Sequence, residues 1–188
     1  MPKGKIFVLS APSGTGKTTI SRYLVREIPG LALSISLTTR VPRTGEVDGQ
    51  DYHFVSREEF QKLIKKKTFA EWSNVFGNYY GTLHSFIQDN IKKGRPVLLN
   101  IDTQGGLQIK KLYRGAKLIG LLPPSRKEQE KRLRQRADLS EEEIRRRLEE
   151  TRKERKILLE HYDVRFINRN LKTTCARIKK FILSHINR

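Results

Sequence analysis

Residues 6–19 read I-F-V-L-S-A-P-S-G-T-G-K-T-T, an apolar run that leads into small residues, a lysine and two hydroxyls. In the phosphate-binding pattern G-x-x-x-x-G-K-[ST], Gly16, Lys17 and Thr18 keep their places, whereas Ala11 stands where the first glycine usually is. A buried strand before such a loop lets backbone N–H groups converge on a phosphate at the start of a helix. The other interpretation, a glycine-rich turn without a ligand, requires neither the lysine nor the hydroxyl. The pattern therefore predicts a nucleoside triphosphate site.

Each part of this phosphate loop (residues 11–18) has an expected task. Lys17 would reach the β- and γ-phosphates as a catalytic residue, and the Thr18 hydroxyl would ligate Mg²⁺. The residues that we expect to contact the triphosphate are Ala11, Pro12, Ser13, Gly14, Thr15, Gly16, Lys17, Thr18 and Thr19.

The composition is strongly basic. The chain of 188 residues has 39 Lys and Arg against 20 Asp and Glu, a formal net charge of +19. A basic surface suggests nucleic-acid binding, but the excess is spread along charged helical patterns instead of forming a tail. We interpret it as solvated helix faces and a pocket for polyanions, and we expect no nucleic-acid partner. The source of the remaining charge is not explained.

Cysteine usage and apolar patterning exclude several classes of protein. The single Cys175 rules out an internal disulfide and a cysteine zinc cluster. No apolar stretch approaches the roughly 20 residues that span a bilayer, and the N-terminus has no signal-peptide pattern. We therefore expect a cytoplasmic protein without a membrane partner.

Strands and helices are expected to alternate along one domain. Short, continuously apolar runs at residues 5–9, 96–101, 117–122 and 164–167 predict buried strands with amphipathic helices between them. This predicts the α/β class: a P-loop NTPase-type parallel sheet with helices on both faces. Gly14, Asp102 and Asn168 follow or end predicted strands, so we expect them in one crevice beyond the carboxyl ends of the sheet.

Two segments interrupt the alternation, at about residues 38–90 and 137–150, and both carry arginines. The planar guanidinium of arginine can donate two parallel hydrogen bonds to a phosphate. The arginines of the first segment therefore suit the binding of an acceptor phosphate. Those beside the second suit a closing lid. Spacing alone does not rank Arg147 against Arg145 and Arg146. The candidates are Arg40 and Arg43 beside Tyr52, and Arg136 and Arg147 at the second segment.

Five stretches together resemble guanylate kinases, in order and spacing. They are A-P-S-G-T-G-K-T-T (11–19), S-I-S-L-T-T-R-V-P-R-T-G-E-V-D-G-Q-D-Y-H-F-V (34–55), F-A-E-W (69–72), G-N-Y-Y-G-T (77–82) and I-D-T-Q-G-G (101–106). The resemblance implies a kinase that converts GMP and ATP to GDP and ADP with Mg²⁺. It also implies that dGMP is accepted in place of GMP. It also implies a core (1–37, 91–136 and 151–188), a GMP-binding insert (about 38–90) and a lid (about 137–150).

The resemblance also assigns roles to single residues. Glu71 and Thr82 would read guanine, whose N1–H and N2–H donors suit a carboxylate and whose O6 accepts from a hydroxyl. Asp102 would assist at the nucleotide or the metal, and Asn168 would lie near the adenine of ATP. Taken alone, Thr82 also fits the N-cap of the next helix. The residues implied to hold the GMP phosphate are Ser36, Arg40, Arg43, Tyr52 and Tyr80.

Some features leave alternatives open. Family members commonly carry an acid where this chain has Asn100, which leaves the metal role of that strand end in doubt, and Leu37 stands where a second serine is frequent. A guanylate-kinase-like interaction module without activity is one alternative, although it would not need an intact Lys17. A kinase for a ribose bisphosphate is another, although it would not need Glu71. Monomer and homodimer are both open.

Overall fold

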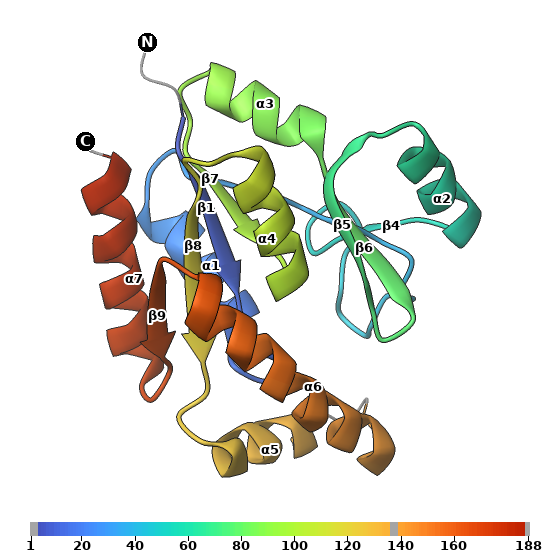
Figure 1. Cartoon of the computed structure of the whole chain (residues 1–188), viewed down its shortest axis with the longest axis vertical. Coiled ribbons are helices and arrows are strands. Elements are labelled where there is room, and N and C mark those ends of the chain that lie inside the picture. The colour runs from blue at the N-terminus through green and yellow to red at the C-terminus, as the bar shows by residue number, and fades with distance from the viewer. Residues whose placement is uncertain (1–3, 136–138, 187–188) are drawn as a thin grey trace.

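A five-stranded parallel sheet forms the centre of the molecule, which is described here from a computed structural model that covers residues 4–135 and 139–186. The parallel pairing fits strands that are separated in sequence by helices (Figure 1). In spatial order this main sheet contains β2 (Ala32–Leu33), β7 (Val97–Asn100), β1 (Ile6–Ser10), β8 (Lys117–Leu122) and β9 (Val164–Ile167).

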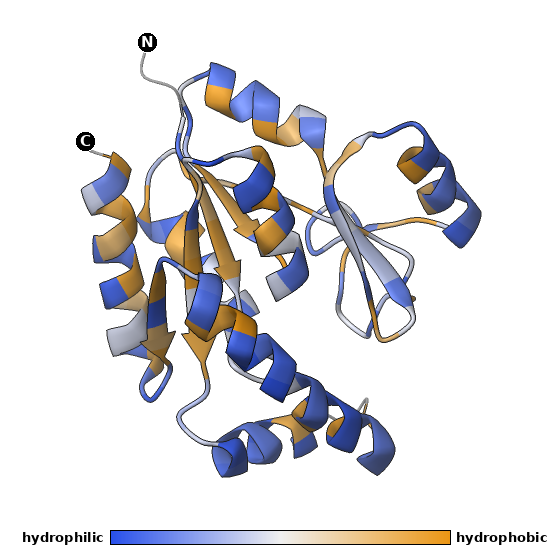
Figure 2. Ribbon diagram, viewed as in Figure 1, coloured by the Kyte–Doolittle hydropathy of each residue, from blue (hydrophilic) through white to orange (hydrophobic). Residues whose placement is uncertain are grey.

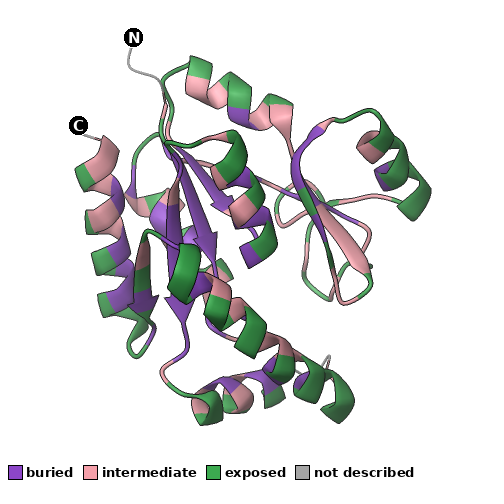
Figure 3. Ribbon diagram, in the orientation of Figure 1, coloured by how far each residue is buried: buried purple, intermediate pink, exposed green. Residues whose placement is uncertain are grey.

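Helices cover both faces of the main sheet, as the sequence predicted. Side chains alternate along β1: Phe7 and Leu9 join the core cluster on one face, and Ile6 and Val8 join the cluster on the other. Strands buried on both faces must be apolar throughout, and Figure 3 shows the central strands β1, β7 and β8 as mostly buried. The first face packs against α1 (Lys17–Glu27) and α7 (Leu171–Ile186), and the second against α3 (His84–Lys92), α4 (Thr103–Leu112) and α6 (Glu141–His161).

A separate four-stranded sheet lies beside the main sheet and has its own core. Leu37, Phe60 and Phe69 form that core, with Phe60 and Phe69 stacked at 4.5 Å between ring centroids. The apolar run at 31–37 does not form a single strand, because its two ends pair in different sheets. In spatial order this small sheet contains β4 (His53–Phe54), β3 (Leu37–Thr38), β6 (Asn78–Leu83) and β5 (Phe69–Val75), and α2 (Arg57–Lys65) packs against it.

A small apolar cluster joins α5 (Arg126–Arg134) and α6, the two charged helices on either side of the start of the predicted lid. Leu133 of α5 packs with Ile144 and Leu148 of α6, and most of the remaining surface of both helices is hydrophilic (Figure 2). Ser140 starts α6 with a complete capping box, in which Glu143 returns the hydrogen bond. Within the described ranges, no helix combines the length and the apolar character needed to cross a membrane.

Helix starts place two of the predicted site residues. Thr82 lies inside β6 and does not cap α3, whose N-cap is Leu83, so that interpretation was wrong. Asp102 is the N-cap of α4, directly after β7, and therefore stands at the carboxyl edge of the main sheet. The phosphate loop follows β1 at the same edge. Parallel strands thus bring the loop and Asp102 together.

Candidate active site

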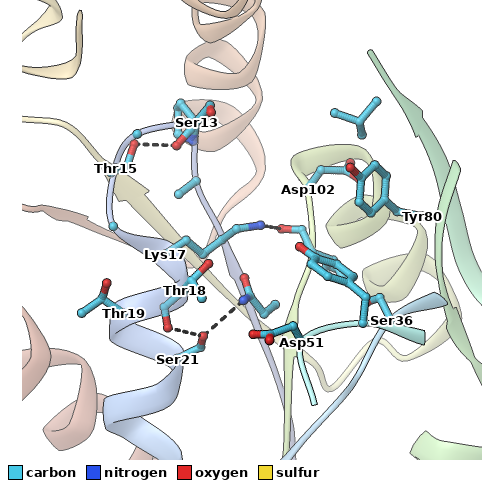
Figure 4. A pocket seen from close by; sticks show the side chains of 18 of the residues that line it. Ser13, Thr15, Lys17, Thr18, Thr19, Ser21, Ser36, Asp51, Tyr80 and Asp102 are labelled. Atoms are coloured by element: carbon cyan, nitrogen blue, oxygen red, sulfur yellow. Dashed lines mark hydrogen bonds between the residues drawn. The ribbon is translucent and has the colours of Figure 1, made fainter. Parts of the chain in front are cut away.

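A cavity of about 500 Å³ lies between the phosphate loop and the small sheet, and it gathers most of the predicted site residues (Figure 4). The loop follows β1 of the main sheet, while the facing side chains come from β5, β6, the residues just before β3 and the turn-rich segment between β3 and β4. The predicted residues that line this cavity are Ala11, Pro12, Ser13, Gly14, Thr15, Gly16, Lys17, Thr18, Thr19, Ser36, Arg40, Arg43, Tyr52, Glu71, Tyr80, Asp102 and Arg147.

The backbone of the phosphate loop takes a shape that glycine makes accessible. Gly14 and Gly16 have φ values of 78° and 93°, in the left-handed region that residues with a side chain rarely adopt. Buried Thr15 closes the turn, with its hydroxyl donating to the Pro12 carbonyl at 2.7 Å. The loop runs directly into α1, whose first residue is Lys17. The N-terminal backbone of a helix thus faces the cavity, where it favours an anion.

Lys17 extends from the loop to the end of β7. Its Nζ donates a hydrogen bond of 2.8 Å to the Ile101 carbonyl, next to Asp102 (Figure 4). Burial lowers the pKa of Lys17, and the negative charges of Asp102, Glu154 and Glu71 oppose that shift. A buried ammonium surrounded by acids is a strong point charge for a phosphate group to approach.

Asp102 links the two sheets. Its Oδ1 accepts from the backbone N–H groups of Gln104 at 2.8 Å and Gly105 at 3.0 Å, which caps α4. Its Oδ2 accepts a hydrogen bond from the Ser73 hydroxyl of β5. Both carboxylate oxygens are therefore fixed, and the carboxylate remains on the wall of the cavity.

Glu71 is a buried residue of the cavity lining, and one of its carboxylate oxygens lacks a hydrogen-bond partner among the described residues. Only 2% of its surface is exposed, and burial raises its pKa to about 7, with the charge of Asp102 adding to the shift. Thr82, its neighbour across the β5–β6 pair, lies close enough to oppose that rise in the pKa. Nevertheless, neither Glu71 Oε1 nor the Thr82 hydroxyl has a hydrogen bond of good geometry among the described residues. Thr82 itself is not among the residues that line the cavity. Buried polar atoms without partners are costly unless a ligand supplies them.

The two glycines that follow Asp102 make room for buried side chains. A Cβ at Gly105 would lie 2.4 Å from Glu71 Oε2, and one at Gly106 would lie 2.1 Å from the Tyr162 hydroxyl oxygen. That hydroxyl donates to Ser10 Oγ at 2.7 Å, at the end of β1. The start of α4 therefore fits closely against both Glu71 and Tyr162.

Arg40 is held in place by Glu46, a residue for which the sequence predicted no role. Glu46 accepts two hydrogen bonds from Arg40 Nη2, at 2.8 and 2.9 Å, and one from the Arg43 backbone N–H at 2.8 Å. The guanidinium carbon of Arg40 also lies 5.3 Å from the centroid of the Tyr52 ring. Glu46 ends the R-V-P-R-T-G-E run, so its closeness to Arg43 in a turn was a usable signal.

The structure distinguishes Arg147 from Arg145 and Arg146, which their spacing in the sequence could not rank. Arg147 lines the cavity and its Nη1 donates to Ser13 Oγ at 3.2 Å, whereas Arg145 and Arg146 do not line it. Arg132, which we did not predict, also lines it. Arg136 lies outside the residues that the structure describes.

Asn168 contacts the phosphate loop from behind. Its Nδ2 donates to the Thr15 carbonyl at 2.9 Å, and it does not line the cavity. Its Oδ1 has no hydrogen-bond partner within the described chain. A Cβ at Gly16 would come within 3.0 Å of its Nδ2. In this structure Asn168 therefore supports the loop.

Three other cavity residues affect the charge and the hydrogen bonding of the site. Glu154 of α6 lies seven residues after Arg147, a helical spacing that places both on one face; burial raises its pKa to about 8, against the effect of Lys17. Asn100 donates from Nδ2 to Ser21 Oγ at 3.2 Å, and its Oδ1 lacks a partner among the described residues. Asp51 forms an ion pair with Arg22, which joins the turn-rich segment before β4 to α1.

Comparisons with known proteins agree on one family. The family model described as guanylate kinase matches residues 3–185. A guanylate kinase of Fusobacterium nucleatum is 47% identical over 178 residues, which cover 93% of this chain and 94% of the relative. A guanylate kinase of Trichodesmium erythraeum is 40% identical and covers 97% of each. The crystal structure of guanylate kinase from Anaplasma phagocytophilum matches with a TM-score of 0.82 at 33% identity, covering all of this chain and 89% of that one.

Proposed function

Since this chain belongs to the guanylate kinase family and is an ATP:GMP phosphotransferase, we propose that the cavity described above holds both substrates end to end. ATP would lie with its phosphates in the phosphate loop. GMP would lie between the arginines of the insert and Glu71. One observation carries this placement: the phosphate loop and the side chains of the small sheet line the same cavity of about 500 Å³.

The acceptor phosphate would be held by a set of cations and hydroxyls. Arg40 is oriented by Glu46 and by the Tyr52 ring, so little rotamer freedom is lost when it binds a phosphate. The Tyr52 and Tyr80 rings contact each other at 5.9 Å, which fixes two phenol groups beside it. Phosphoryl transfer depends mainly on positioning and on charge. The proposed phosphate ligands are Ser36, Arg40, Arg43, Tyr52 and Tyr80.

Guanine would satisfy the buried atoms that lack partners. Glu71 would accept from N1–H and N2–H, and the Thr82 hydroxyl would donate to O6. Adenine presents an acceptor nitrogen where guanine has N1–H, so it would leave the carboxylate unpaired. Sites that mispair in this way discriminate by about 10⁴-fold or more.

On the donor side, three cations would offset the charge on the transferring phosphoryl group. Lys17 and Arg147 line the cavity, and Arg136 is proposed from the sequence alone. Asn168 would approach the adenine of ATP with its unpaired Oδ1 while its Nδ2 holds the loop. Closure of residues 137–150 over the cavity would exclude water.

The residues present fit a magnesium ion. Mg²⁺ takes oxygen ligands, keeps several waters and usually has one or two protein ligands beside the phosphates. Two residues of the cavity offer such oxygens: Thr18, an exposed residue, through its hydroxyl, and Asn100 through its buried Oδ1, which has no hydrogen-bond partner among the described residues. When bound with ATP, the ion would neutralise charge on the phosphate oxygens. Asn100 supplies its oxygen without the negative charge of an acid.

The test is an ADP-release assay with GMP, AMP, UMP and CMP as acceptors. We expect ADP release with GMP at least about 10³-fold more efficient than with AMP, because adenine leaves Glu71 mispaired. Equal rates with GMP and AMP would contradict the proposed base site, and release without any acceptor would contradict the shared cavity. The division into core, insert and lid, the cytoplasmic location and the choice between monomer and homodimer stay predictions.

A further inference from the structure

Phe76 stands at a junction between three parts of the molecule. It lies in the turn between β5 and β6, the hairpin of the small sheet whose closed end lies on the side of α6 (Figure 1). The guanidinium carbons of Arg147 and Arg146 lie 4.8 and 5.6 Å from the centroid of its ring. Phe76 also lines the cavity. A single ring thus connects the insert with the two arginines of α6.

The turn holds this ring in a conformation that a phenylalanine rarely adopts. Phe76 has a φ of 52°, in the left-handed region, and Gly77 follows with a φ of 86°. The side chain of Asn74 closes the turn by accepting from the Gly77 backbone N–H at 3.0 Å. Left-handed backbone is unfavourable for a bulky residue, and such outliers gather at functional sites. Glycine would suit the backbone of residue 76 better, so the ring itself calls for an explanation.

The contacts of Arg147 continue the connection to the donor side. Its Nη1 donates to Ser13 Oγ of the phosphate loop at 3.2 Å. A guanidinium over the face of an aromatic ring is attracted by the ring quadrupole, which favours the orientation in which the planes stack. The path from Phe76 through Arg147 to Ser13 therefore runs from the acceptor half of the cavity to the donor half.

We propose that Phe76 is a positioning residue, whose ring fixes the guanidinium of Arg147 against the phosphate loop when the insert stands in the position seen here. The inference rests on the proposed function, in which Arg147 offsets charge on the transferring phosphoryl group. Phe76 acts through that guanidinium and needs no contact with either nucleotide. Movement of the insert would then change the orientation of a donor-side cation.

The experiment compares Phe76→Leu, Phe76→Gly and Phe76→Tyr by steady-state kinetics and thermal unfolding. We expect kcat to fall about 3- to 20-fold in Phe76→Leu and Phe76→Gly, the range to which cation–π contacts correspond. The KM for GMP should change less than about twofold, since the GMP ligands are untouched. Phe76→Tyr keeps the ring face and should restore kcat. Phe76→Gly should unfold no earlier than the wild type, because its backbone fits the turn.

A matched control removes a similar contact from the same insert. The Arg57 guanidinium lies 4.9 Å from the Tyr79 ring, away from the cavity lining, and Arg57→Gln should leave kcat unchanged. A double-mutant cycle with Arg147→Lys adds a second readout: the effect of Phe76→Leu should shrink to less than about twofold in that background.

The outcomes separate this inference from the proposed function. A purely structural role predicts that Phe76→Gly keeps full activity, and that result would overturn the inference. So would an unchanged kcat in Phe76→Leu, a Phe76→Tyr variant as slow as Phe76→Leu, or additive effects in the cycle. Loss of GMP-dependent ADP release in the wild type would instead contradict the proposed function.

Discussion

The two halves of the cavity are built from different parts of the chain. The donor half is a backbone structure, in which Gly14 and Gly16 give the loop its shape and the start of α1 faces the ligand. The acceptor half consists of side chains from short strands and a turn, among them Arg40, Tyr52 and Glu71. Backbone amides bind any phosphate alike, whereas side chains distinguish one base from another. Rate should therefore depend on the first half and selectivity on the second.

The largest expected effect tests the donor half. Lys17→Ala should lower turnover by about 10³-fold or more, because it removes a buried cation from the transferring phosphate. The dissociation constant of GMP, measured by calorimetry without ATP, should stay within about twofold, since GMP ligands lie elsewhere. Lys65→Ala, a change in α2, is the control. Turnover near the wild-type rate would show that the loop has been misassigned.

The second effect tests whether selectivity belongs to the acceptor half. Glu71→Ala should lower the preference for GMP over AMP in kcat/KM by about 10²-fold, because the carboxylate that pairs with N1–H and N2–H is lost. Thermal unfolding checks that the variant folds. If the ratio of the two kcat/KM values is unchanged, base reading does not occur at Glu71.

The third effect is a pH dependence of GMP binding that follows from Glu71 in the acceptor half. Glu71 has a pKa raised to about 7 by burial, and it must be ionised to accept from guanine. Protonation as pH falls should weaken GMP binding by about tenfold between pH 8 and pH 6, from the pKa alone. The phosphate of GMP titrates near pH 6 as well. Calorimetry of GMP binding to Glu71→Gln measures the contribution of the phosphate alone. If the affinity for GMP depends on pH as steeply in this variant as in the wild type, Glu71 is not the cause.

The same shift has a consequence for stability. Because the pKa of Glu71 lies above its ordinary value of 4.5, the unfolded chain releases this proton first. The contribution of Glu71 to the free energy of unfolding is therefore full below about pH 4.5 and declines as the pH rises to about 7.

The smallest effect concerns the link between the halves. Arg22 of α1 pairs with Asp51 of the insert, and 66% of the arginine side chain is exposed. Exposed ion pairs contribute little, so Arg22→Ala should raise the KM for GMP by less than about threefold, and less at high salt. Arg26→Ala is a matched control, since its pair with Glu27 lies within α1. A tenfold rise would mean that the ion pair governs the position of the insert.

The contrast between the halves also explains what the sequence could predict. The phosphate loop follows from local pattern, because Gly16, Lys17 and Thr18 act where they stand in the chain. The parallel sheet follows from apolar runs that alternate with helices. Asp102 was expected in the crevice because parallel strands end at one edge, and the structure places it there.

The acceptor half could not be derived in this way. Glu71 lies in a strand that looks solvated by local pattern, and it becomes buried only when β5 packs against the start of α4. It was found through the family resemblance. Thr82 was a fitting N-cap by local rules, but β6 continues past it and Leu83 takes that position. Phe76 carried no sequence signal, since its role depends on a contact between distant elements.

The fit of Gly105 against Glu71 bears on how the acceptor preference could be redesigned. A methyl group at position 105 would lie 2.4 Å from Glu71 Oε2, so a side chain fits there only if the carboxylate moves. A shorter residue at position 71 would release that space. We therefore expect larger residues at position 105 to be accepted more readily after Glu71 has been shortened than before.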